Sequence, residues 1–416
     1  MHLCLFEDHE VYHLSPIAQT RGVYLIRTGA LNNLVRLWET FDRPKLSLHA
    51  RTEIEEIVRS QTGLPVNEGE DEKGYLFVNG RITVLPIQLV ARLARKSSKK
   101  KKAKVFMQQG IVVAAWAPDM KSLKFDGPID ASTFEGLPTE EVTGVEMIGR
   151  LWHLVDGLQA RLEQDLARLS RNYKPETPPQ VHASVTLYNP ESIFIGPDVE
   201  IAPGAIITAA DGPVFIARGV KIMEGAIVKG PIYLGKRSTV KARAEISRSA
   251  IGPICKAGGE VTDVIMQSFS NKAHEGFLGH AYLGSWCNIG AGTNASNLRN
   301  DYNDATLFNE HLNAFEPTGR QFLGLIMADY CKIGISSMVN TASVFGVGCN
   351  LFGSEFLPRH LPSFSWGSPH TGFEPYRLDK AYESIERLMA RRARTLSDVT
   401  KRQLEVIFNN AQAPAL

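Results

Sequence analysis

A histidine and a lysine lie two residues apart in residues 270–280, and both carry side chains that could do chemistry near neutral pH. His274 has the side chain whose unperturbed pKa suits a general base. Lys272 carries a positive charge that could meet a phosphate. Proton abstraction from a substrate and the binding of an anionic group need these two kinds of side chain. A histidine at a turn is also often only a solvent-exposed side chain with no chemical role. The pair alone therefore leaves open whether these residues are functional or only exposed.

Polar side chains follow this segment. Asn288 comes first, and the next stretch contains Asn294, Asn297, Asn300, Asp301, Asn303 and Asp304. Amide side chains could hold sugar hydroxyls or an amide group. Loops on rigid scaffolds carry function disproportionately. We therefore take Asn288, Asn294 and Asn297 as candidate substrate-binding residues.

The element that must position these side chains is indicated by a six-residue repeat of branched apolar residues. Its members are Ile195, Ile201 and Ile207, then Ile216, Ile222, Val228, Leu234, Val240 and Ile246, and later Ile333, Val339, Phe345 and Leu351. Neither a helix nor ordinary strand alternation gives this period. A parallel β-helix does, because three short strands per coil each turn one apolar residue inward. The repeat falters at residues 255–270 and fails at 294–323, where polar side chains cannot fill inward positions. We expect residues 294–323 to leave the β-helix as an inserted loop.

The composition bounds the class of protein. A chain of 416 residues is expected to form two or more domains. The net charge of +2 gives no reason to expect nucleic acid as a partner, and no apolar run is long enough to span a membrane. The first residues do not have the pattern of a signal peptide. The five cysteines never form C-x-x-C, and we interpret them as reduced core residues of a cytoplasmic protein.

Four regions follow from these patterns. The apolar pattern of residues 1–138 predicts an α/β domain. It has strands at 75–78 and 111–115 and helical spacing at 34–41 and 54–58. Residues 139–179 predict a long amphipathic helix over 139–172 and a proline-rich linker. Residues 180–368 form the β-helix, and 369–416 a basic helical tail that packs on the body or on a neighbouring subunit. The lysine-rich run from Lys99 to Lys104 is interpreted as a solvated surface rather than a nucleic-acid contact.

Residues 270–280 and 283–293 together resemble the acetyltransferase core of the bacterial bifunctional GlmU enzymes. Further stretches extend the resemblance to the divergent, GlmU-like sugar nucleotidyltransferases: residues 5–8, 14–17, 20–21, 76–81, 324–327 and 362–367. The resemblance covers most of residues 3–370. It implies a shortened, Rossmann-like nucleotidyltransferase domain followed by a left-handed parallel β-helix of hexapeptide repeats with C-terminal helices.

The resemblance also implies roles in the β-helix. His274 is the general base, acetyl-CoA the acyl donor, an amino sugar phosphate the acceptor, and a homotrimer the assembly, because such sites form between adjacent β-helices. This chain departs from the pattern at Phe277, where the characterised enzymes have a tyrosine. The missing hydroxyl puts the acceptor in doubt.

The N-terminal region departs further. A nucleotidyltransferase of this kind opens with a glycine-rich loop that holds phosphates and uses an acidic residue to bind Mg²⁺. The opening segment has no G-x-G, and the position that resembles the metal-binding residue is Arg81, which cannot coordinate a cation. Arg21 and Asp8 remain the best candidates there, with Lys45 as a further phosphate contact. Mg²⁺ is expected only if this domain is active.

Three hypotheses stay open. The first is the acyltransferase, with nucleotidyl transfer in the N-terminal domain as a doubtful addition. The second is a γ-class carbonic anhydrase, but zinc there needs three convergent histidines, and His274 and His280 are six apart on successive faces. The third is a non-enzymatic protein that binds a sugar nucleotide or serves in assembly. We expect no metal site in the β-helix.

Overall fold

The computed structural model describes residues 2–68, 74–94, 103–117, 127–171, 173 and 181–412. The linker residues 174–179 and most of the lysine-rich run, residues 99–102, lie outside these ranges. The chain divides into two compact units, one of Met1–Ile26 with Leu31–Arg150 and the other of Arg27–Ala30 with Leu151–Leu416. No helix among the described residues is long and apolar enough to cross a membrane.

The N-terminal unit is an α/β domain, as predicted. Its mixed sheet has the strand order β2-β1-β3-β6-β5-β7. The strands are β1 (His2–Phe6), β2 (Lys45–Leu48), β3 (Tyr75–Asn79), β5 (Lys104–Gln108), β6 (Ile111–Ala117) and β7 (Thr139–Glu141), and a separate pair is formed by β4 (Ile82–Val84) and β8 (Glu146–Met147). β1 lies between β2 and β3 and is parallel to both. All five residues of β1 are buried, which is typical of a central strand with both faces covered.

Three helices belong to this unit: α1 (Asn33–Thr40), α2 (Glu55–Thr62) and α3 (Ile87–Ala94). The Asn32 side chain accepts a hydrogen bond from the backbone N–H of Val35 at 3.0 Å and so fixes where α1 begins. The predicted strands at 75–78 and 111–115 and the helical segments at 34–41 and 54–58 correspond to β3, β6, α1 and α2, which confirms those predictions.

The helix expected over 139–172 is shorter than predicted. α4 spans Leu158–Arg171, and the residues before it form β7, β8 and a 3₁₀ helix at Leu151–Leu154. Gly157, with φ of +63°, stands in the left-handed region directly before α4. Leucines on both sides of this break keep the helical spacing, and for that reason the sequence pattern predicted one continuous helix.

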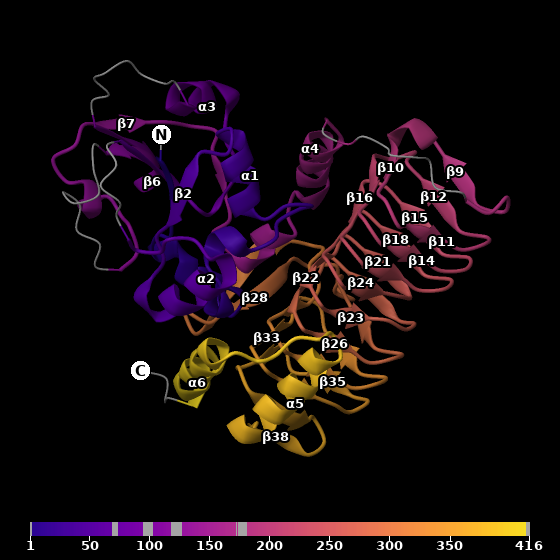
Figure 1. Cartoon of the computed structure of the whole chain (residues 1–416). Helices are drawn as coiled ribbons and strands as arrows, with labels where there is room; N and C mark the ends of the chain where they lie inside the picture. Colours follow the sequence, from indigo (N-terminus) through magenta and orange to yellow (C-terminus); the bar gives the residue numbers. More distant parts are fainter. Residues whose placement is uncertain are drawn as a thin grey trace. The chain divides into compact units, whose positions relative to one another are not determined.

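The second unit is built on a parallel β-helix (Figure 1). Each full coil contributes three short strands, one to each of three sheets. We call these sheets E, F and D, in the order in which each coil passes through them. Sheet E contains β10 (Ile193–Ile195), β13 (Val214–Ile216), β16 (Ile232–Leu234), β19 (Ala250–Ile251), β22 (Ile265–Ser268), β25 (Tyr282–Ser285), β30 (Ile326–Met327), β33 (Val344–Phe345) and β36 (His360–Leu361).

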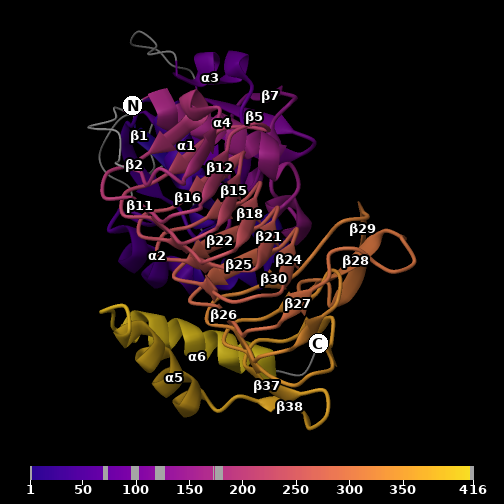
Figure 2. The same cartoon turned by 90° about the vertical axis from the view of Figure 1, so that its right-hand side faces the viewer.

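The other two sheets repeat this arrangement. Sheet F contains β11 (Glu200–Ile201), β14 (Lys221–Ile222), β17 (Thr239–Val240), β20 (Lys256–Ala257), β23 (Asn271–Lys272), β26 (Asn288–Ile289), β31 (Lys332–Ile333), β34 (Asn350–Leu351), β37 (Ser365–Ser368) and β38 (Gly372–Pro375). Sheet D contains β9 (Thr186–Tyr188), β12 (Ile206–Thr208), β15 (Ile227–Lys229), β18 (Glu245–Ser247), β21 (Glu260–Thr262), β24 (Phe277–Gly279), β27 (Asn294–Ala295), β32 (Met338–Val339) and β35 (Phe356–Leu357). Figure 2 shows part of sheet D as a row from β12 to β24.

The six-residue repeat supplies the core of this β-helix. Its members from Ile207 to Ile246 are at most 1% exposed and belong to one continuous cluster inside the coils. Each buried aliphatic side chain of this size stabilises the fold by about 1.5–3 kcal/mol relative to an exposed one. Cys255, Cys287, Cys331 and Cys349 belong to the same cluster, and all five cysteines are buried thiols outside any disulfide, as the core interpretation requires.

The two irregular stretches of the repeat have different structures. At residues 255–270 the coil is not broken but short, because Lys256 pairs with Asn271 fifteen residues later, whereas Lys221 pairs with Thr239 eighteen residues later. Asn288 pairs with Lys332, so the insertion between them leaves the coil, as predicted. The insertion forms an antiparallel hairpin of β28 (Ala305–Asn309) and β29 (Ala314–Arg320), which projects from the coils in Figure 2.

The C-terminal tail forms two helices, α5 (Leu378–Ala390) and α6 (Asp398–Gln412), as predicted. They pack on the body of the β-helix. The Lys332 ammonium donates to Oγ of Ser384 in α5 at 2.6 Å, and Phe408 of α6 meets Phe364 edge to face at 5.4 Å. Lys332 faces outward on sheet F, so this packing places α5 against the outer face of that sheet.

Candidate functional site

The candidate base stands on the tight turn that joins sheet F to sheet D within one coil. β23 ends at Lys272, β24 begins at Phe277, and His274 lies on the turn between them. Its side chain is exposed, and no hydrogen bond to the imidazole is found from the part of the chain that the structure describes. Both ring nitrogens are therefore accessible from outside the coil. This is the arrangement that a general base needs before substrate binds.

Lys272 does not lie outside the coil, as a phosphate ligand would. It occupies an inward position, pairs with Ala257 and Ile289 on the neighbouring coils, and is 1% exposed. Its ammonium donates to the carbonyl oxygen of His274 at 2.6 Å and to that of Glu275 at 2.9 Å. Burial lowers the pKa of Lys272 to about 8. The side chain thus holds the turn that presents His274 from the inside.

The neighbouring coil fixes the same turn from the other side. Gly276 has φ of +111°, and a Cβ atom there would lie 2.2 Å from the carbonyl oxygen of Thr293. The backbone N–H of Gly292 donates to the carbonyl oxygen of Glu275 at 3.3 Å. Only glycine combines this backbone conformation with so close an approach. The turn therefore cannot move without displacing the coil beside it.

The three candidate asparagines lie in different places. Asn288 faces outward on sheet F between Asn271 and Lys332, and no partner for its amide is found among the described residues. Asn294 lies on sheet D, and both ends of its amide are used: it accepts from the N–H of Phe277 at 2.8 Å and donates to Gly292 at 3.1 Å. Of the two, Asn288 has the side chain that is available to a ligand.

Asn297 belongs to a polar network at the corner between sheets D and E. Its amide nitrogen lies 2.8 Å from Nδ1 of His280, and Nε2 of His280 lies 3.8 Å from Asp263. Burial lowers the pKa of His280, and Asp263 opposes this shift in part. Asp263 also accepts from the Arg248 guanidinium, at 2.8–3.1 Å, and from Gln159 of α4 at 3.1 Å.

Sequence reasoning did not identify this network. Its corner residues Arg248, Asp263 and His280 stand on three successive coils, with φ between +44° and +55°. Their separations of 15 and 17 residues are coil lengths, and those lengths are known only once the strands are paired. His274 and His280 lie at two different corners of the coil. Across the ranges that the structure describes, no group of three or more histidine, cysteine or carboxylate side chains could hold a metal ion.

In the N-terminal unit, Asp8 is already paired. Both its carboxylate oxygens accept from the Arg81 guanidinium, at 2.7 and 2.5 Å, and Asn79 donates to one of them at 2.6 Å. The neighbouring Glu7, which sequence reasoning did not single out, is fully buried. It accepts from the backbone N–H groups of Val23 and Arg51 and from the Arg51 guanidinium. Arg21 is buried as well, at the end of a 3₁₀ helix.

These contacts decide whether Mg²⁺ fits at Asp8. A magnesium site needs free carboxylate oxygens and room for several waters. Asp8 has both oxygens bound to a buried guanidinium, which also supplies the positive charge that a cation would bring. The residues present therefore do not fit Mg²⁺ at this position. Arg81 stands where the metal-binding residue was expected, and it pairs with Asp8.

Comparisons with known proteins show what the chain is similar to. Residues 3–174 match the family model described as sugar nucleotidyl transferase. The bifunctional protein GlmU of Bartonella quintana is 23% identical over 305 residues, which cover 70% of this chain and 57% of that protein. The GlmU protein of Trichormus variabilis is 32% identical over 137 residues, which cover 28% of this chain and 30% of the relative.

These matches support a divergent GlmU-like family for the chain. The chain spans just over half the length of the Bartonella relative. A solved structure of an Arabidopsis UDP-N-acetylglucosamine acyltransferase matches 55% of this chain and 88% of that chain, with 13% identity and a TM-score of 0.24. The enzyme of the same name from Campylobacter jejuni matches 54% and 95%, with 14% identity and a TM-score of 0.21.

Proposed function

We propose that the β-helix transfers an acyl group, an acetyl group in the simplest case, from an acyl-CoA to the amine of an amino sugar phosphate. The observation that carries the proposal is the turn at residues 273–276. It presents an exposed His274 imidazole, and its backbone is held by the Lys272 ammonium from inside the coil and by the N–H of Gly292 from the next coil. A base held this rigidly needs little reorganisation before reaction.

In the proposed reaction the amine nitrogen attacks the carbonyl carbon of the thioester, and an imidazole nitrogen of His274 takes the proton that this nitrogen loses. The carbon–sulfur bond then breaks and the thiolate leaves with its electron pair. The proton held by His274 can return to the sulfur, so the products are an amide and free CoA. General-base catalysis of this kind contributes about 10²–10⁴-fold in rate.

We assign the recognition of the acceptor to the outer face of sheet F beside His274. Asn288 is the candidate there whose amide has no partner in the described ranges, so it can bond a sugar hydroxyl. Lys272, Asn294 and Asn297 are retained as supports of the turn and of the inserted hairpin, because their polar atoms are already bonded. Phe277 is half-buried on sheet D and offers no hydroxyl to a phosphate. We also infer a homotrimer, which sedimentation velocity would test.

A second role, for the N-terminal unit, is favoured by the Arg81–Asp8 pair. Since the carboxylate that would hold Mg²⁺ is neutralised from within the protein, we infer that this unit binds a sugar nucleotide or serves in assembly and does not transfer a nucleotidyl group through Mg²⁺ at Asp8.

The proposal is tested by release of the CoA thiol in the presence of amino sugar phosphates. His274→Asn keeps the size and polarity of the side chain but removes the base, and it should lower kcat/KM by about 100-fold or more. His370→Asn, at an exposed histidine of the same unit beside β38, is the matched control and should stay within about twofold. Equal turnover in His274→Asn and the wild type would refute the role of His274.

A further inference from the structure

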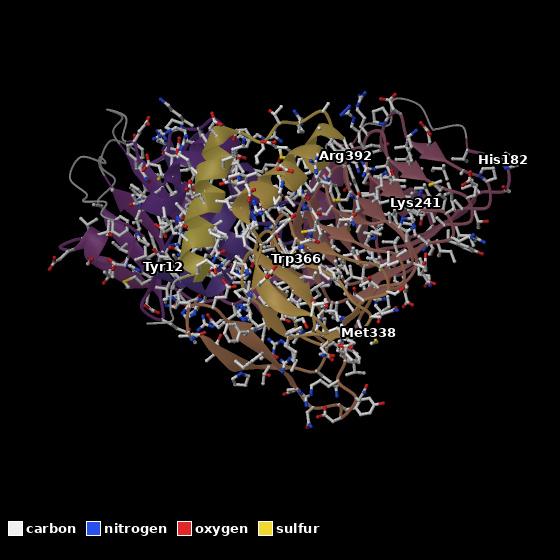
Figure 3. All side chains as sticks on the ribbon, turned by 90° about the horizontal axis from the view of Figure 1, so that it is seen from below. Tyr12, His182, Lys241, Met338, Trp366 and Arg392 are labelled. Atoms are coloured by element: carbon white, nitrogen blue, oxygen red, sulfur yellow. The ribbon has the colours of Figure 1, made fainter. Side chains whose placement is uncertain are left out.

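Four cationic side chains gather on the outer face of sheet F and have no carboxylate partner in the described part of the chain. Lys241 and Lys256 come from successive coils of the β-helix, and Arg391 and Arg392 follow the end of α5. None of the four takes part in an ion pair among the residues that the structure describes. Figure 3 labels two of them, Lys241 and Arg392. We call this group the sheet F cation cluster.

The strand pairing places the members of the cluster close together. Lys256 pairs with Asn271 on the next coil, and the Arg392 guanidinium donates to Oδ1 of Asn271 at 3.3 Å. Lys241 follows the inward Val240, and its backbone N–H donates to the carbonyl oxygen of Ala257 at 2.8 Å. Neighbouring strands lie about 4.8 Å apart. The two lysines are therefore neighbours on the surface, and Arg392 lies beside Lys256 through Asn271.

The electrostatics of Lys256 are consistent with a cluster that lacks its counter-charge. Partial burial lowers the pKa of Lys256, and the positive charges of Arg392, Lys241 and Arg391 lower it further. The lysine at the equivalent outward position two coils away is neutralised: the Lys221 ammonium lies 2.8 Å from a carboxylate oxygen of Glu200. Unpaired like charges held together reduce stability and persist where a ligand offsets them.

We propose that the sheet F cation cluster is a binding site for a ligand that carries two adjacent phosphate groups. Two lysines on successive coils and two arginines facing them supply four positive charges. A pyrophosphate group carries several negative charges on two adjacent phosphates and so matches a cluster of several cations. Arginine forks and lysine ammonium groups are the side chains that recognise phosphate oxygens.

The position of the cluster links it to the turn that carries His274. Asn271, which accepts from Arg392, begins the strand that leads into that turn. A phosphorylated ligand held at the cluster is thus anchored on sheet F, next to the coil that carries the proposed base. The proposed site is argued from the unpaired cations and does not depend on acyl transfer, so a binding measurement alone tests it.

Isothermal titration with inorganic pyrophosphate at constant ionic strength near 0.15 M tests the proposal. The wild type should bind saturably, and Lys256→Gln with Arg392→Gln should weaken binding by about tenfold or more, since each charge-assisted contact is worth roughly that factor. Lys221→Gln is the matched control and should change the dissociation constant by less than about twofold. Absence of saturable binding, or an equal loss in Lys221→Gln, would overturn the site.

Two further measurements separate the alternatives. Competition of pyrophosphate with CoA, with a nucleoside diphosphate and with a sugar monophosphate identifies the source of the phosphates, and the monophosphate should compete least. Without ligand, the Lys256→Gln, Arg392→Gln double variant should unfold at the same temperature as the wild type or higher, because it removes repulsion. A lower unfolding temperature would mean that the cations support the fold, against the proposal. His274→Asn should bind pyrophosphate normally, so failure of the acyl-transfer proposal leaves this result unchanged.

Discussion

Lys272→Met is the substitution that best separates the support of the His274 turn from the stability of the fold. Methionine has nearly the same length and fills the inward position, but it cannot donate to the carbonyl oxygens of His274 and Glu275. In the wild type these acceptors lie 2.6 and 2.9 Å from the ammonium. The variant therefore removes the internal support of the turn and leaves the core filled.

The effect on stability at pH 7 should be small. Two hydrogen bonds to a charged donor are lost, each worth about 1.5–3 kcal/mol. The burial of the ammonium is relieved at the same time, and the fall of its pKa from 10.5 to about 8 corresponds to about 3 kcal/mol against the charged form. The two terms largely cancel, so we expect a net change within about 2 kcal/mol. Activity should fall by about tenfold, because the imidazole is no longer held in place.

The pH dependence gives the sharper test. Because the pKa of Lys272 is lower in the folded state, the unfolded chain holds more protons between about pH 8 and pH 10.5. The contribution of Lys272 to the free energy of unfolding therefore rises with pH in that window, by about 1 kcal/mol between pH 7 and pH 9. Well below pH 8 the Lys272 side chain is protonated in both the folded and the unfolded chain, so its burial lowers the free energy of unfolding by the full amount.

Urea unfolding of the wild type and of Lys272→Met at pH 7 and pH 9 measures this contribution as a difference between the two proteins. The wild type should gain stability relative to the variant as the pH rises. Lys221→Met, at an exposed lysine paired with Glu200, should show no such difference. A flat or falling difference for Lys272→Met, or full activity in that variant, would refute the reasoning about the buried ammonium.

Three other outcomes follow from the structure. Arg81→Met should destabilise the N-terminal unit by about 3–5 kcal/mol, because it leaves the buried Asp8 carboxylate without its partner, and Asp8→Asn with Arg81→Met should be milder; urea unfolding of each compares them. Adding Mg²⁺ or EDTA should not shift the unfolding temperature of the wild type through Asp8; a rise with Mg²⁺ that Asp8→Asn abolishes would contradict the misfit. Gly276→Ala should lower the unfolding temperature of the β-helix more than Gly372→Ala, since both glycines have positive φ but only the first would bring a Cβ against a neighbouring carbonyl. Equal losses in the two variants would show that the close contact at Thr293 relaxes freely.

The sequence predicted the β-helix well because its period belongs to the architecture itself. Each inward residue recurs at a fixed offset in every coil, so the repeat can be read without knowing which strands pair. The same argument could have placed Lys272 correctly. It falls in the column of Val240, Ala257 and Ile289, where every side chain points inward. Its charge drew attention to a surface role, and that role does not agree with its 1% exposure.

What the sequence could not provide is the set of contacts that depends on coil length and on distant pairing. His280 and Asp263 meet because one coil happens to be seventeen residues long, and no local pattern records that length. Arg81 was singled out as a departure from the expected pattern and Asp8 as a remaining candidate, but their mutual pairing across 73 positions appears only in three dimensions. The unpaired state of the sheet F cation cluster likewise depends on where α5 ends.

The central claim is that His274 is the base of an acyl transfer carried out by the β-helix. Mass spectrometry of the acceptor after incubation with acetyl-CoA and glucosamine-1-phosphate tests it most directly. The wild type should yield acceptor acetylated on its amine, with one CoA thiol released for each product, and His274→Asn should yield about 100-fold less in the same time. Acetylated product at an equal rate from both proteins would contradict the claim, as would CoA release by the wild type with no acetylated amine on this or any other amino sugar phosphate tried.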